Sequence, residues 1–355
     1  MTPLTKERDE LGSRDVYKAH DVSGGGSERR SREYFDSWVI CKLFLWRRMF
    51  NTNSAMVTGS LHARSFGYVD PNFPNPGGVN DTSIIIYGYT PSIALAAFAA
   101  AWFFVHLVLH TAQTCKFRSW WWITFSVGMI FEIVGYIARS LSAKQDPYNL
   151  NYFVLNYFFI VTAPVFIAAG IYTILSALIA RLGSRYTFLR PTIILAFFIT
   201  SDVISTIVQI AGATLIGVKE SNSEDPTTAN NILLAGLAYQ VFAMSVFVIL
   251  MLAFEFRARR AIKERRLQVF CLSFTVATLM VYMRTIFRLI ETAEGLGANL
   301  STNEVYFACL EFAPIALVAL LLCIWHPGRC LGPKVRDSRE RFAKRDGSDP
   351  ASVQY

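Results

Sequence analysis

Charged side chains are scarce in this sequence of 355 residues. Asp, Glu, Lys and Arg make up 17% of it, whereas a soluble domain carries about 25%. Hydrophobic residues make up 53%, and the mean hydropathy is +0.35. The apolar residues form long runs and do not alternate with polar ones as in a half-buried helix or strand. These features exclude an ordinary soluble domain and predict an integral membrane protein.

The sequence also lacks the motifs of several enzyme and cofactor classes. It contains no Gly-rich phosphate loop followed by Lys-Ser/Thr, so we find no sign of an ATPase of its own. It has no nucleophile or metalloprotease signature, and its six cysteines form no close pair with zinc-ligand spacing. We therefore expect no catalytic residues, no metal and no cofactor.

The net charge of +8 does not indicate a nucleic-acid partner. The basic residues lie in short segments beside apolar runs, and the C-terminal region mixes both signs. Lys and Arg placed in this way set membrane topology and contact anionic lipid headgroups. We therefore expect membrane lipids as partners, and no nucleic acid.

Seven apolar runs reach the length of about 20 residues that a membrane-spanning helix needs. They cover residues 90–110, 120–142, 152–180, 191–217, 231–254, 268–291 and 304–326. Each run must be helical, because hydrocarbon cannot satisfy unpaired backbone groups. The predicted fold class is all-α, a seven-helix transmembrane bundle. Pro164 and Pro314 lie inside the third and seventh runs and are expected to kink them.

The charges between the runs predict an orientation. Basic residues gather after the first, third, fifth and seventh runs: Lys116, Arg118, Arg181, Arg185, Arg190, six Lys or Arg within 257–266, Arg329, Lys334 and Arg336. The positive-inside rule places these segments in the cytoplasm, which puts the N-terminus outside and the C-terminus inside. Glycosylation sequons at Asn80 and Asn299 both lie on the predicted outer side.

The regions that flank the runs predict three parts of the chain. Residues 1–83 form a polar, largely disordered extension, 84–328 the transmembrane domain, and 329–355 a cytoplasmic tail. The apolar stretch 38–46 is too short to span, and no signal peptide starts the sequence. We interpret this stretch as an interfacial segment or as part of an upstream extension, with Met56 as the alternative start. Residues 70–83, rich in Pro and Gly, are expected to form an extended external lead-in.

Polar residues recur inside the apolar runs with helical spacing. Each ionisable group at the centre of a membrane helix costs at least about 2.5–3.5 kcal/mol on insertion scales, so such groups face a bundle interior, a partner or a wet cavity. The candidate cavity residues are Glu132, Arg139, Asp202, Gln209, Gln240, Arg284, Arg288, Glu291 and Glu311.

The predicted orientation assigns these residues a depth in the membrane. Glu132 and Asp202 lie near the middle, and the other seven lie in the outer half. We therefore expect a polar cavity that opens outward above the two central acids. The alternative is a buried network of ion pairs that only fixes helix packing. His106 and His110 are interpreted as interfacial histidines, because no third metal ligand accompanies them.

Several ordered motifs resemble one known family. They are Tyr87–Ser92 (YGYTPS), Glu132–Arg139 (EIVGYIAR), Ala163-Pro164 with Ala168, Ala169 and Tyr172, Ser201–Ser205 with Gln209 and Gly212, Gly236–Gln240, Arg284–Glu291 with Gly295 and Glu304, Glu311, and His326–Gly328. This succession resembles the fungal RTA-like lipid-translocating exporter family over roughly residues 84–328. The resemblance implies a seven-helix plasma-membrane protein that exports or flips amphiphiles such as sphingoid long-chain bases, sterol-like amines or porphyrins. It also implies roles in lipid asymmetry and in resistance to lipophilic toxins.

The sequence leaves two classes of function open. In the first, the protein is an amphiphile translocator without its own ATPase. Glu132, Asp202 or Glu311 would hold a lipid amine, and the arginines would balance these acids or contact phosphate-like groups. In the second, it is a seven-helix receptor or sensor that binds an amphiphile and does not transport it.

Overall fold

The computed structural model describes residues 68–73, 77, 81–82, 85–187, 190–221, 225, 227–294 and 299–331. All of them belong to the second of two compact units of the chain, residues 59–355. Within these ranges the regular structure is helical, and the only β contacts are the isolated bridges Tyr68–Ile85 and Asp81–Asn149. The predictions for 38–46, Met56, Asn80 and 332–355 lie outside the described residues.

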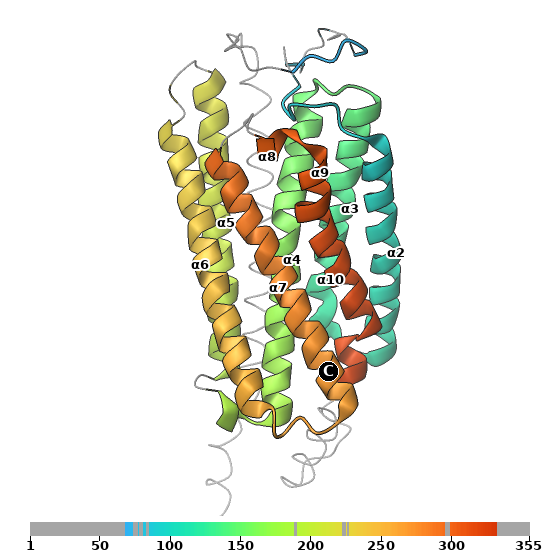
Figure 1. The fold of residues 1–355 in the computed structure, drawn as a ribbon, viewed down its shortest axis with the longest axis vertical. Coiled ribbons are helices and arrows are strands. Elements are labelled where there is room, and N and C mark those ends of the chain that lie inside the picture. Colours follow the sequence, from blue (N-terminus) through green and yellow to red (C-terminus); the bar gives the residue numbers. More distant parts are fainter. Residues whose placement is uncertain are drawn as a thin grey trace, which may run out of the picture. The chain divides into compact units, whose positions relative to one another are not determined.

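Seven helical spans in these ranges are long and apolar enough to cross a membrane, which confirms the predicted fold class (Figure 1). The first six are built on α2 (Ile93–Phe117), α3 (Ile123–Lys144) with the preceding η1 (Trp120–Trp122), α4 (Leu150–Leu182), α5 (Pro191–Ser221), α6 (Thr227–Ala258) and α7 (Arg265–Glu294). The seventh combines α9 (Glu304–Tyr306), the π-helix η3 (Phe307–Phe312) and α10 (Ala313–Ile324). Short turns η2 (Ser184–Tyr186) and α8 (Asn299–Thr302) lie between spans.

The first span differs most from its predicted bounds of 90–110. It begins only after Ser92, whose side chain caps the helix by accepting a hydrogen bond from the Leu95 N–H. It continues to Phe117 and ends at Arg118, which has the left-handed backbone (φ 52°) common after a helix C-terminus. Hydropathy alone could not locate these ends, because a helix also extends through polar residues wherever its backbone bonds continue.

The spans pack in chain order around α4. α3 packs on α2 and α4, α5 on α4 and α6, α7 on α6, and α10 closes the ring against α7 and α2 (Figure 1). In the most apolar stretch of α4, 83% of residues are buried, compared with 28% in α2. α4 is therefore the central helix, which agrees with its lack of charged residues between Tyr152 and Ala180.

The Tyr89 end is where α2 begins and α3 ends, and the His326 end is the opposite one. The predicted orientation makes the Tyr89 end external; the helices by themselves do not test this prediction.

The lead-in segment, residues 68–92, is hydrogen-bonded to the Tyr89 end in its described parts. The Ile85 N–H donates to the Tyr68 carbonyl at 2.9 Å, and the Thr82 N–H donates to the Tyr148 carbonyl at 3.0 Å. Asp70 accepts hydrogen bonds from the Thr90 hydroxyl at 2.5 Å and the Asn72 N–H at 2.9 Å. These bonds hold the pKa of the Asp70 carboxyl below its ordinary value. The described parts of the segment are thus bonded to one another and to Tyr148 in the α3–α4 connection.

Candidate functional site

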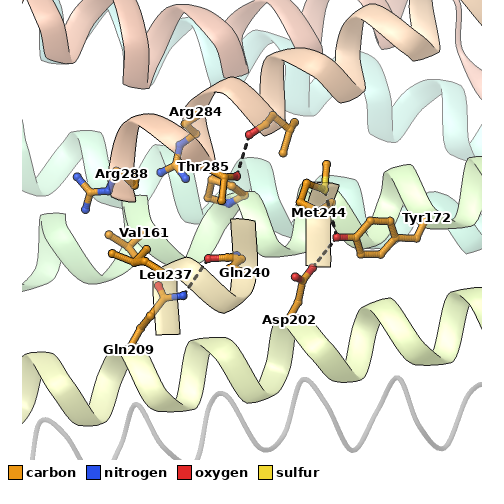
Figure 2. Close-up of a pocket in the computed structure, with 13 residues that line it drawn as sticks. Val161, Tyr172, Asp202, Gln209, Leu237, Gln240, Met244, Arg284, Thr285 and Arg288 are labelled. Carbon is orange, nitrogen blue, oxygen red and sulfur yellow. Dashed lines mark hydrogen bonds between the residues drawn. The ribbon is translucent and has the colours of Figure 1, made fainter. Parts of the chain in front are cut away.

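A polar cavity lies between α4, α5, α6 and α7. It holds about 440 Å³ of empty space, including its open mouth. Figure 2 shows its lining: Val161, Pro164, Ala168 and Tyr172 from α4, Asp202 and Gln209 from α5, Leu237, Gln240 and Met244 from α6, and Val281, Arg284, Thr285 and Arg288 from α7. Five of the nine predicted cavity residues are therefore brought together: Asp202, Gln209, Gln240, Arg284 and Arg288.

Asp202 is the one carboxylate in this lining. Its side chain is buried, and its Oδ2 accepts a hydrogen bond from the Tyr172 hydroxyl at 2.9 Å (Figure 2). The same hydroxyl lies 3.5 Å from the Met244 sulfur on α6. Tyr172 thus connects α4 to both helices of the α5–α6 pair.

Two amides form the next layer of the cavity. The Gln209 Nε2 donates to the Gln240 Oε1 at 2.9 Å and to the Ser205 Oγ at 2.7 Å, while the Ser205 hydroxyl donates to the Gly236 carbonyl at 2.8 Å. These bonds need a close approach of α5 and α6. Gly212 permits it, because a Cβ there would lie only 2.6 Å from the Leu233 backbone nitrogen.

Arg284 reaches the cavity wall and two acceptors outside it. Its Nη2 donates to the Ile160 carbonyl at 2.7 Å and also to the Glu311 Oε1. The Ile160 carbonyl lacks its usual helical donor because residue 164, four positions later, is a proline. Arg284 therefore satisfies the backbone group that Pro164 leaves unpaired, a relation between α4 and α7 that spacing along the sequence does not reveal.

Glu311 lies on η3, the π-helical turn that precedes Pro314. A π-helical turn is wider than an α-helical one and commonly occurs next to functional residues. Proline at position 314 cannot donate a backbone bond, so the irregular turn falls where the sequence predicts a kink. The turn aims Glu311 at Arg284, and both side chains are buried.

Arg288 and Glu291 form a second pair, one helical turn further along α7. The Arg288 Nη1 lies 2.7 Å from the Glu291 Oε2, and the guanidinium stacks over the Tyr157 ring at 5.0 Å from its centroid. Arg288 lines the cavity, whereas Glu291 is not part of the lining. The positive charge of Arg288 is therefore balanced by a carboxylate that lies outside the cavity lining.

Arg139 lies away from the cavity and holds the lead-in segment. Its Nη2 donates to the Tyr89 hydroxyl at 2.6 Å and lies 3.3 Å from the Glu304 Oε1. The guanidinium also lies over three aromatic rings, 4.1 Å from the Phe307 centroid, 5.1 Å from that of Tyr87 and 5.6 Å from that of Tyr89. This arrangement matches the alternative in which an intramembrane charge fixes packing.

Glu132 does not line the cavity either. Its side chain is 2% exposed and lies within electrostatic range of Arg284 and Glu311. Of the two central acids expected at the cavity floor, Asp202 thus faces the cavity and Glu132 is buried beside the Arg284–Glu311 pair. The sequon residue Asn299 is the first residue of α8, and its glycosylation stays a prediction.

The two histidines of α2 are buried within the bundle. His110 accepts a hydrogen bond at Nδ1 from the Trp122 indole at 3.3 Å, and its Nε2 donates to the Ala319 carbonyl at 3.1 Å. These partners fix one neutral tautomer. Its ring packs 5.8 Å from that of His326, which closes the His326 end with an aromatic cluster. In the described ranges, no three His, Cys, Asp or Glu side chains are arranged to hold a metal.

Sequence reasoning missed two elements of the site. Tyr172 was noted in a motif but not as the partner of Asp202, since a tyrosine in an apolar run carries no charge signal. The pairing of Glu304 with Arg139 was also missed, because the π-helical turn between Glu304 and Glu311 changes the direction in which Glu304 projects, and α-helical spacing does not reveal it.

Comparison with known proteins agrees with the motif resemblance. The family described as "RTA1 like protein" matches residues 125–334. The "Sphingoid long-chain base transporter RSB1" of Saccharomyces cerevisiae is 30% identical over 260 residues, covering 62% of this chain and 68% of the relative. The "Protoporphyrin uptake protein 1" of the same yeast is 24% identical over 285 residues (69% and 92%), and "Protein RTM1" is 26% identical over 203 residues (56% and 64%). No solved structure matches. The chain is thus a multi-pass membrane protein that belongs to the RTA1-like family.

Proposed function

We propose that the protein translocates cationic amphiphiles across the plasma membrane and that Asp202 binds their ammonium group. The observation that carries the proposal is the buried Asp202 carboxylate in the lining of a membrane-embedded cavity. An intramembrane carboxylate is costly, and pairing with a substrate cation offsets that cost. The name of the yeast sphingoid-base transporter supports the same substrate class.

The rest of the lining suits an amphiphile with hydroxyl groups beside its amine. The Gln209 and Gln240 amides offer both donors and acceptors, and Leu237 and Val281 offer apolar walls. The headgroup would bind among these side chains, and a long alkyl chain would extend between the helices into lipid.

Glu311 and Glu132 are less suited to bind the amine. The Glu311 Oε1 accepts from Arg284, and neither carboxylate lines the cavity. Arg284 and Arg288 do line it, and each is paired with a glutamate outside the lining. Of the three predicted amine ligands, Asp202 is therefore the one placed to bind the amine.

The experiment uses purified full-length protein in liposomes with a fluorescent long-chain base. We expect the wild-type protein to bind the base and to move it between leaflets, and Asp202→Asn to lose both activities. The control is Glu255→Gln, because Glu255 is another carboxylate of the bundle, accepts a hydrogen bond from Thr275 at 2.7 Å and lies outside the cavity lining. Unchanged movement in Asp202→Asn would contradict the assignment. Binding without movement in the wild type would favour the sensor alternative.

A further inference from the structure

Three arginines of the bundle each have their own glutamate. Arg139 pairs with Glu304, Arg284 with Glu311, and Arg288 with Glu291. Glu132 has no such ion pair with any cation in the described part of the chain, although it lies near Arg284. The buried cluster around the Arg284–Glu311 pair therefore contains one more carboxyl group than its arginines can balance.

Among the described residues, no further cation lies near Glu132 to balance its charge. The titratable and charged groups in electrostatic contact with Glu132, or with the Arg284–Glu311 pair, are Tyr136 on α3, Tyr157 on α4, Arg284, Arg288 and Glu291 on α7, and Glu311 on η3. Tyr136 is in turn in electrostatic contact with Arg139. The tyrosines are neutral, and the three arginines have the glutamate partners described above. With every carboxyl ionised, this buried cluster would carry an uncompensated negative charge, which a low-dielectric interior strongly opposes.

The pair beside Glu132 is also incompletely hydrogen-bonded. The Glu311 Oε2 and the Arg284 Nε are buried and have no hydrogen-bond partner among the described residues. A carboxyl group that holds a proton becomes a donor, and Glu311 presents an open acceptor in the same cluster. Both the charge balance and the unpartnered oxygen therefore point to a bound proton.

We propose that Glu132 is a proton-binding site whose occupancy is linked to that of the cavity through Arg284. Arg284 is the shared element, because it lines the cavity and bonds to Glu311 in the same buried cluster as Glu132. This linkage rests on the proposed function, since it needs a cation that enters the cavity at Asp202.

Charge balance fixes the direction of the linkage. A cationic amphiphile beside Asp202 adds a positive charge near the cluster, which favours release of the proton from Glu132. By reciprocity, binding of a proton at Glu132 favours release of the amphiphile. The protein would thus exchange one proton for one cationic amphiphile, and a proton gradient would supply the energy for transport.

The proton itself is measured by infrared spectroscopy of the full-length protein. A protonated carboxyl group has a carbonyl stretch that the ionised group lacks. We expect Glu132→Gln to lose one such band that Glu255→Gln retains, and we expect this band to disappear from the wild type at alkaline pH. Equal spectra for wild type and Glu132→Gln would overturn the proton site. If Glu132→Gln does not fold, Glu132→Asp should move the band instead of removing it.

The linkage is measured by transport in liposomes with a pH gradient of about one unit. Exchange of one proton for one amphiphile predicts up to about tenfold accumulation of a fluorescent long-chain base by the wild type. Glu132→Gln should still bind the base and let it equilibrate, with no accumulation. Gradient-driven accumulation equal to that of the wild type would refute the linkage. If Asp202→Asn binds and moves the base normally, the proposed function fails, while the infrared result stands independently.

Discussion

The two sides of the cavity treat their polar groups differently. On the ionic side, formed by α7, the arginines of the lining are matched to glutamates outside it: Arg284 to Glu311 on η3 and Arg288 to Glu291. On the amide side, α5 with α6, the link is a neutral bond between Gln209 and Gln240, and Asp202 bonds to the hydroxyl of Tyr172.

This difference separates structural charge from charge available to a ligand. An arginine already neutralised by a glutamate gains little from a new partner, whereas a carboxylate in the cavity lining lies where a ligand cation can reach it. The comparison also predicts unequal stability. Breaking an ion pair strands a buried charge, whereas breaking an amide bond strands only a dipole.

The largest expected effect follows from breaking the ionic side at Arg284. Arg284→Met removes the partner of Glu311 and the donor to the Ile160 carbonyl, so we expect the free energy of unfolding to fall by about 3–5 kcal/mol. Denaturant unfolding in detergent, followed by tryptophan fluorescence, measures it. The double variant Arg284→Met with Glu311→Met should recover much of the loss, because no unpaired charge remains. Gln240→Met on the amide side should cost only about 1 kcal/mol, and equal losses from both single variants would remove the contrast.

A smaller effect is expected from separating α5 and α6. In Gly212→Val the new Cβ would meet the Leu233 backbone, so the two helices must move apart and the Gln209–Gln240 bond must lengthen. We expect a loss of about 1–3 kcal/mol in unfolding free energy and weaker binding of a long-chain base. Ala211→Val is the control, because Ala211 is exposed on the same helix. A Gly212→Val protein as stable as this control would show that close packing does not shape the amide side.

The smallest effect concerns the lead-in segment, which belongs to neither side. Because the folded-state pKa of Asp70 is lowered, its contribution to stability is present above the unfolded-state value of about 3.9 and is lost as the pH falls through the folded-state value. Thr90→Val removes the largest cause of the lowered pKa, so loosening of the segment should begin at higher pH. Hydrogen exchange at the Ile85 amide, which bonds to Tyr68, reports this loosening. An unchanged exchange profile would contradict the role of Asp70.

Much of the fold was predictable because apolar run length reports directly on helices in lipid. The spans at Trp120, Pro191 and Glu304 begin at the predicted residues, and the first span begins three residues later than predicted. All spans except the one at Pro191 end a few residues beyond their apolar runs. Helical spacing also identified Asp202 and Gln209, because residues seven apart share one face. Spacing could not decide which helices face each other, so it could not separate the cavity lining from Glu132 or Arg139. That division depends on tertiary contacts such as Arg284 with the Ile160 carbonyl.

The π-helical turn at Phe307–Phe312 has a consequence for comparing sequences of this family. Such a turn contains one residue more than an α-helical turn, and one residue corresponds to about 100° of rotation about the helix axis. Deleting a single residue there would turn Glu304 away from Arg139 while leaving α10 in place. Where a relative is one residue shorter in this part of the span, the gap in the alignment therefore belongs in this turn. Such a relative should have lost the Arg139–Glu304 pair or replaced both residues.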